Sequence, residues 1–118
     1  MEYEIRSIVD AELEEFRRCQ GLAFGTEFNP EHLEAGRQIF EAERSLATFD
    51  HGQIVGTAGI FSYRMTVPGG VSLPTAGVTM VSVKPTHRRR GILSGMMRRQ
   101  LSDVRARGEA LAILCRGD

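Results

Sequence analysis

The chain has 118 residues, which suits one domain with a modest core and excludes a large multidomain enzyme. No apolar run is long enough to span a membrane, and the first residues lack the basic and then apolar pattern of a signal peptide. The net charge is zero, yet residues 1–50 hold 12 acidic and 5 basic side chains, and residues 51–118 hold 3 acidic and 10 basic ones. This asymmetry favours an anionic ligand for the second half.

The first forty residues predict one strand and two helices. Residues 3–9 alternate apolar and polar positions and predict an opening strand. Asp10 is suited to cap a helix that carries Leu13 and Phe16 and ends near Gly21 or Gly25. Asn29 followed by Pro30 predicts the start of a second helix.

The next forty residues read as strands separated by turns. Strands are predicted over residues 45–49 and 53–63, with a turn at residues 50–52 and a second strong turn at residues 68–70. Gly56 and Gly59 inside the longer strand indicate a bulge or a close approach. Residues 71–73 begin another strand, which Pro74 is expected to interrupt at an edge or bulge.

Residues 77–115 predict a strand, a basic loop, a helix and a final strand. The apolar residues of the helix form one stripe at helical spacing: Ile92, Leu93, Met96, Met97, Leu101 and Val104. Residues 110–115 are continuously apolar, as in a strand buried on both faces. Because strand–helix–strand units are almost always right-handed and parallel, residues 77–83 and 109–115 should be neighbours. The chain therefore predicts an α/β (α+β) fold with a mixed sheet flanked by helices.

The joint between the strand ending at Val83 and the helix starting at Ile92 has the features of an anion site. The first N–H groups of a helix have no partner within it and lie at the positive end of its dipole. Gly91 permits close approach of a ligand, and arginines at positions 88–90 can bind phosphate oxygens. The alternative is a solvated surface turn.

Other chemistries have less support in the sequence. His32, His51 and His87 lack metal-ligand spacing, and no motif of a metalloprotease, a serine hydrolase or an ATP-binding loop occurs. No aromatic residues alternate with the arginines, so we expect no nucleic-acid binding. Cys19 and Cys115 are expected to be buried thiols rather than a disulfide, which favours a cytoplasmic location.

The segment V-x-V-x-P-x-x-R-R-x-G-I-L resembles motif A of the GNAT superfamily of N-acetyltransferases, Q/R-x-x-G-x-G/A. Arg88 and Gly91 occupy motif positions, whereas Leu93 replaces the final Gly or Ala. With V-P-G-G at residues 67–70 and L-P-T-A-G-V-T before the motif, the chain is most similar to the enhanced-intracellular-survival acetyltransferases, where Leu is usual at that place.

The resemblance implies that acetyl-coenzyme A binds along the strand and the loop. Backbone groups near the end of the strand would bind the pantetheine arm, and N–H groups of residues 88–94 the pyrophosphate. The cofactor-binding residues so implied are Val81, Ser82, Val83, Arg88, Arg89, Arg90, Gly91, Ile92, Leu93 and Ser94. His87 is expected in the phosphate loop or in solvent rather than as a catalytic base.

The resemblance also implies an acceptor site for an amine, possibly cationic, such as an aminoglycoside, a polyamine or lysine. Phe24, Phe28 and Met80 would line it. The alternative for the two phenylalanines is that they pack the first two helices together.

The domain is expected to be incomplete at its C-terminal end. In the family, a helix and further strands follow the last strand and carry the general-acid tyrosine. The general acid is therefore expected beyond Asp118, and residues 1–118 contain no identifiable catalytic residue. Two functions stay open: the donor-binding part of an N-acetyltransferase, or a non-catalytic interaction or oligomerisation module. A homo-oligomer is expected in either case.

Overall fold

The computed structural model describes residues 3–24, 41–109 and 111–114. Its strands are β1 (Glu4–Ser7), β2 (Leu46–Asp50), β3 (Gln53–Val67), β4 (Val71–Val83) and β5 (Leu111–Leu114). Its helices are α1 (Leu13–Phe24) and α3 (Ile92–Ala106), with short 3-10 turns η1 (Asp10–Glu12), η2 (Ala42–Arg44) and η3 (Pro85–His87). The second helix predicted from Asn29 lies outside the described residues.

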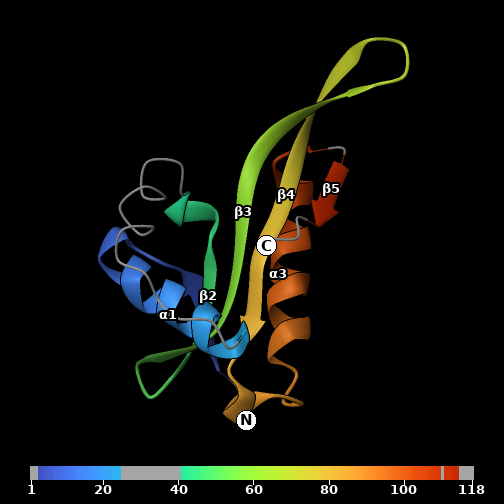
Figure 1. Ribbon diagram of the computed structural model, residues 1–118. Helices are drawn as coiled ribbons and strands as arrows, with labels where there is room; N and C mark the ends of the chain where they lie inside the picture. The colour runs from blue at the N-terminus through green and yellow to red at the C-terminus, as the bar shows by residue number, and fades with distance from the viewer. Residues whose placement is uncertain (1–2, 25–40, 110, 115–118) are drawn as a thin grey trace.

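The five strands form one mixed sheet in the order β1-β2-β3-β4-β5 (Figure 1). The first four are antiparallel neighbours, and β5 pairs parallel to β4, from Thr75 with Leu111 to Val78 with Leu114. This confirms the predicted mixed sheet and the parallel pair joined through a helix.

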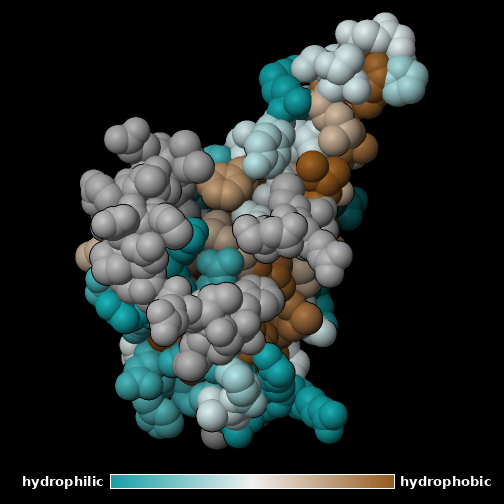
Figure 2. Space-filling model, viewed as in Figure 1, coloured by the Kyte–Doolittle hydropathy of each residue, from teal (hydrophilic) through white to brown (hydrophobic). Residues whose placement is uncertain are grey.

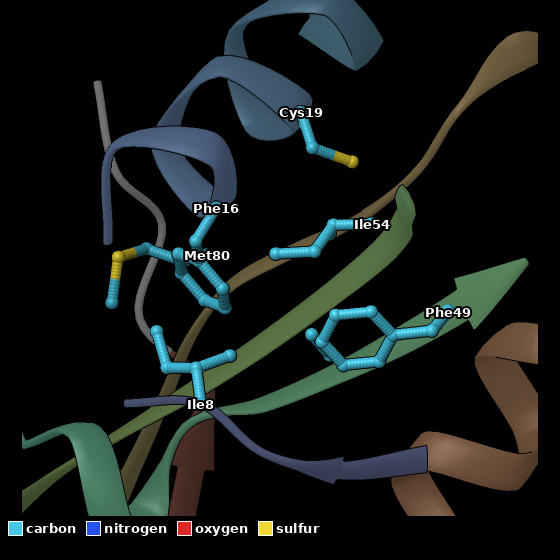
Figure 3. Packing of buried hydrophobic residues seen from close by; sticks show 7 residues of the cluster. Ile8, Phe16, Cys19, Phe49, Ile54 and Met80 are labelled. Carbon is cyan, nitrogen blue, oxygen red and sulfur yellow. The ribbon is translucent and has the colours of Figure 1, made fainter. Parts of the chain in front are cut away.

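The two helices cover opposite faces of the sheet. On one face, Phe16 and Cys19 of α1 pack against Phe49, Ile54 and other buried side chains (Figure 3). On the other face, α3 buries Ile92 and Met96 against β3. Since neighbours along a strand point to opposite faces, Ile54 belongs to the first cluster and Val55 to the second.

A long two-stranded arm, formed by the end of β3 and the start of β4 on either side of the turn at residues 68–70, projects from the body of the molecule (Figure 1). Strand β3 runs to Val67, four residues past the predicted end, because it pairs with β4 up to the turn. Tyr63, Met65 and Val71 are exposed there, and Figure 2 shows the arm clear of the remaining surface.

Two predictions about the strands are corrected. Pro74 does not interrupt β4, which is continuous and pairs Pro74 with Arg64 of β3. It does lie at an edge of the described sheet, as predicted, because β5 begins to pair with β4 only at Thr75. Strand β5 is not buried on both faces, since Ala112 is exposed at the edge of the described sheet.

Two helix predictions are also corrected. Asp10 is not a helix cap but the first residue of η1, and Val9 takes the N-cap position. The Val9 N–H donates a hydrogen bond to Glu12 Oε1 at 3.0 Å. In α3, Leu93 and Leu101 are 47% and 58% exposed, whereas the polar Gln100 is buried. The buried positions are spaced by four, so the inward stripe is narrower than hydrophobicity alone predicted: Ile92, Met96, Gln100 and Val104.

The two strand glycines behave as predicted. A Cβ on Gly56 would lie 2.9 Å from Ile92 Cγ2, so β3 approaches the start of α3 closely there. A Cβ on Gly59 would lie 2.6 Å from Met80 Cε, and the β3–β4 register shifts between Thr57 and Gly59. Both glycines therefore lie at close contacts with neighbouring side chains, as predicted.

Candidate functional site

A cavity of about 440 Å³ lies where β4 ends and α3 begins. Its volume falls within the range of small-molecule sites. Nine of the ten residues predicted from the motif line it: Val81, Ser82, Val83, Arg88, Arg89, Gly91, Ile92, Leu93 and Ser94. The fold thus brings together residues that the sequence placed on a strand, a loop and a helix.

The N-terminus of α3 is open toward this cavity. Gly91 is the N-cap residue, no side chain caps the helix, and its first turn has no acidic residue. The first bond of the helix runs from the Gly95 N–H to the Gly91 carbonyl at 3.0 Å. The N–H groups of the preceding turn therefore have no intrahelical partner and lie at the positive end of the dipole.

The loop reaches this position through left-handed backbone conformations. Arg89 has φ +63° and Gly91 has φ +77°. No atom other than those of its chain neighbours lies within 4 Å of a Cβ built on Gly91. Glycine is therefore required here by the backbone angle, and the space beside it is open to a ligand.

A β-bulge in β4 shapes the strand side of the cavity. Thr57 pairs with Ser82 and Gly59 with Thr79, so β4 carries one extra residue, and Met80 takes φ +52°. The Thr57 hydroxyl donates to the Met80 carbonyl at 2.6 Å and stabilises this conformation. Because of the extra residue, the side chains of β4 change faces at the bulge.

The change of faces has two results. Val81 and Val83 pack against the cluster beneath α3, together with the start of that helix. The Met80 side chain, 8% exposed, instead joins the core under α1 (Figure 3). Its predicted part in acceptor binding stays a prediction, and the side chain as placed serves the core.

The remaining edge of β4 is also relevant to binding. Strand β5 pairs with residues 75–78 of β4. Among the described strands, residues 79–83 are therefore paired on the β3 side alone. Backbone groups on the other side face toward the cavity end of the sheet and are suited to pair with an extended ligand.

Among the predicted site residues, Arg90 is described but does not line the cavity. The Arg90 guanidinium donates to the Tyr3 hydroxyl at 3.0 Å, and this bond raises its pKa. The Phe24 side chain and Phe28 lie outside the described residues, so the predicted roles of these three residues stay predictions. Asp118 also lies outside the described residues, and the general acid expected beyond it stays a prediction as well.

His87 lines the cavity, although the sequence analysis did not include it among the binding residues. Its Nε2 lies 2.8 Å from Asp50 Oδ2, and its Nδ1 lies 2.7 Å from the Thr86 hydroxyl. The Tyr3 ring meets the imidazole edge to face, with centroids 6.1 Å apart. The position of His87 directly before the arginines was the signal in the sequence that could have placed it at the cavity. Its partner Asp50 could not be identified in this way, because it is 37 residues away in the chain.

The described part of the chain offers neither a metal centre nor a reactive cysteine. Within it, no three His, Cys, Asp or Glu side chains are grouped so as to hold a metal ion. Cys19 is 2% exposed, and burial raises its pKa to about 11, as expected for a packed thiol rather than a nucleophile. No helix in the described ranges is long and apolar enough to cross a membrane.

Solved structures share this architecture. Eis1 from Mycobacterium abscessus matches 92% of the chain with a TM-score of 0.82 and 36% identity, over 27% of its own length. The aminoglycoside N-acetyltransferase AAC(6')-Iy, solved in complex with CoA, matches 98% of the chain, over 78% of its own length, with a TM-score of 0.76. At 20% identity, the second likeness concerns the fold alone.

Curated relatives agree. An uncharacterised N-acetyltransferase of Streptomyces avermitilis is 57% identical over 84 residues, 71% of the chain and 20% of its own length. N-acetyltransferase Eis of Mycobacterium tuberculosis is 40% identical over 81 residues, 63% of the chain and 20% of its own length. The chain thus spans about a fifth of the length of these two relatives.

The family comparison covers nearly the whole chain. The acetyltransferase (GNAT) domain matches residues 4–115, which include the sheet, both described helices and every residue of the cavity. With the Eis-like neighbours, this match confirms the resemblance noted in the motif. The chain belongs to the GNAT family of N-acetyltransferases.

Proposed function

We propose that the cavity at the start of α3 is the acetyl-coenzyme A site of an N-acetyltransferase that acylates an amine. The observation that carries the proposal is the convergence on one cavity of the open helix N-terminus, Arg88, Arg89 and the edge of β4 that no described strand pairs beyond Val78. The CoA complex of the fold neighbour supports the choice of ligand class. When bound, the coenzyme would supply the activated acyl group.

The residues present suit two parts of such a ligand, its uncharged arm and its pyrophosphate. Val81, Val83 and Ile92 give the cavity an apolar wall, which suits an uncharged arm. Backbone N–H groups after Gly91 and the neighbouring arginines suit a pyrophosphate, since they donate hydrogen bonds and add positive charge. The chain's own contribution is therefore to bind and orient the donor.

The acceptor would be a small-molecule or peptide amine that attacks as the neutral base. We propose no base or acid among the described residues and place the general acid beyond Asp118. The acidic first half of the chain favours a cationic acceptor such as an aminoglycoside, a polyamine or lysine.

A cytoplasmic homo-oligomer whose N-terminal acetyltransferase domain includes residues 1–118 stays part of the proposal. The second candidate, a non-catalytic module with this fold, predicts no coenzyme affinity.

The test is titration calorimetry of the chain with acetyl-coenzyme A and with coenzyme A. Binding is expected in the wild type and should disappear in Gly91→Asp, because the new carboxylate enters the cavity and repels phosphate. Gly70→Asp is the matched control, since Gly70 also has a positive φ and open space but lies at the tip of the arm. A folded wild type without affinity would overturn the donor site and favour the non-catalytic module.

A further inference from the structure

His87 and Asp50 form a pair at the wall of the cavity that the motif does not explain. Asp50 ends β2 and His87 ends η3, so the pair joins the basic loop to the sheet. The His87 side chain is 16% exposed and that of Asp50 is 23% exposed. A carboxylate so near an anion site is unexpected, because it opposes the binding of phosphate.

Both ring nitrogens of His87 are engaged within the protein. In the neutral ring, Nε2–H donates to Asp50 Oδ2 and Nδ1 accepts from the Thr86 hydroxyl. After protonation, Nδ1–H donates to the same hydroxyl oxygen, because a hydroxyl can both donate and accept. The imidazole can therefore gain a proton without losing a partner or moving.

The surrounding groups define the charge that such a proton would meet. Arg88 and Arg89 line the same cavity, and Arg90 contacts Tyr3, whose ring lies against His87. The second oxygen of Asp50 lies 2.8 Å from His51 Nδ1, but the His51 side chain is 93% exposed. The hydrogen bond from His87, more than the nearby His51, keeps the pKa of Asp50 below its ordinary value, so the carboxylate stays ionised.

We infer that His87 is a positioning residue of the donor site that takes up a proton when an anionic coenzyme binds, and that Asp50 holds it in place for this purpose. The inference rests on the proposed function. The proton comes from the solvent and converts the negatively charged Asp50–His87 pair beside the cavity into a neutral carboxylate–imidazolium pair. Binding and protonation then favour each other, because the anion stabilises the positive ring and the ring attracts the anion.

The experiment is calorimetry with dephospho-coenzyme A, in buffers of different ionisation enthalpy. This ligand lacks the phosphate monoester, which itself titrates at about pH 6. We expect the wild type to take up part of a proton, and its affinity to rise several-fold, on the order of threefold to tenfold, between about pH 8 and about pH 6. His87→Gln should bind with little dependence on pH and no proton uptake.

His87→Gln retains a nitrogen donor for Asp50, so a purely structural role would leave its binding like that of the wild type. His51→Gln is the matched control: it also contacts Asp50 but does not line the cavity, and it should retain the proton uptake. The His87 ring protons, followed by NMR in the wild type with and without ligand, test the same point without a variant.

The outcomes separate this inference from the function on which it rests. Ligand binding by the wild type without proton uptake, or equal uptake in His87→Gln, would overturn the role of His87 and leave the donor site standing. A folded wild type that binds neither acetyl-coenzyme A nor dephospho-coenzyme A would overturn both.

Discussion

Each end of α3 is flanked by a glycine in the left-handed conformation, but the two ends differ in whether the protein itself satisfies their backbone groups. Gly91 before the helix has φ +77° and Gly108 after it has φ +72°, and a Cβ on either glycine would have no contact within 4 Å. At the C-terminal end, the Gly108 N–H donates to the Arg105 carbonyl and the Glu109 N–H to the Val104 carbonyl. These are the two bonds of a Schellman motif, so that end is closed by its own backbone.

The N-terminal end has no such closure and borders the cavity. The comparison teaches that a left-handed glycine at a helix end does not by itself indicate a site. What differs is whether the helix's terminal polar groups are already satisfied by the protein. We therefore expect substitutions at the closed end to change stability alone, and substitutions at the open end to change ligand affinity as well.

The largest expected effect concerns the closed end. Arg44 binds Glu109 through both carboxylate oxygens, and the two side chains are 1% and 7% exposed. Glu109→Gln leaves the buried guanidinium with only the more exposed Asp103 carboxylate, 3.4 Å away, and should lower the free energy of unfolding by about 3–5 kcal/mol. Urea denaturation measures this loss, and Glu14→Gln, which removes one partner of an exposed ion pair, is the control. An unchanged unfolding midpoint would contradict the stabilising role of the pair.

The next effect concerns the open end. Arg88 lines the cavity, and Arg88→Ala should weaken the binding of coenzyme A by about 1.5–3 kcal/mol, the range for hydrogen bonds to charged groups. Titration calorimetry checks this value. Arg105→Ala, at the other end of the helix, is the control and should leave the affinity unchanged. Equal losses in both variants would indicate a general effect of charge instead of a contact.

A matched pair of substitutions tests the comparison directly. Gly91→Ala and Gly108→Ala should each lower the free energy of unfolding by about 1 kcal/mol, because an alanine is strained at positive φ. Gly91→Ala should in addition weaken coenzyme binding, since its methyl group points into the open space beside the cavity in which the coenzyme is proposed to bind. If Gly108→Ala weakened binding equally, the distinction between the two ends would fail.

The smallest effect is a pH dependence near the open end. The hydrogen bond from His87 keeps the pKa of Asp50 below the usual value for Asp. The resulting stabilisation is complete above the pKa that Asp50 has in the unfolded chain and is lost as the pH falls through its lower folded-state pKa. In Asp50→Asn, the free energy of unfolding should therefore fall less steeply as the pH is lowered into the acid range. Urea unfolding at several pH values measures this dependence. A variant curve parallel to the wild type would refute this contribution.

Local features of the fold followed from the sequence, whereas pairings distant in the chain did not. Turns with strong local chemistry, such as residues 50–52 and 68–70, were predicted because a few adjacent residues determine them. The loop before α3 was predicted for the same reason. The predicted interruption at Pro74 was wrong, because a proline disturbs a strand only where a neighbouring strand needs the missing N–H as a donor. Whether such a neighbour exists depends on the arrangement of the sheet and not on the local sequence.

The candidate site shows the same limit. The backbone groups and arginines lie in one short segment, so the motif alone indicated them. His87 depends on Asp50, Arg90 on Tyr3, and the placement of Met80 on a bulge opposite Gly59. The hydrophobic pattern predicted that Leu101 faces the core, but its neighbour Gln100 is the buried residue. The hydrophobicity of a side chain indicates only indirectly which face of a helix it occupies.

The order of the strands has a consequence for how the molecule assembles. Each antiparallel pair joins strands that are neighbours in sequence, and the β2–β3 and β3–β4 turns are two and three residues long. Closing such short loops costs little chain entropy, whereas the β1–β2 and β4–β5 pairings must each close around a helix. We expect the β2–β3–β4 meander to form early in folding and these two pairings later. Since the cavity lies at the β4–β5 crossover, the binding site would be completed in a late step.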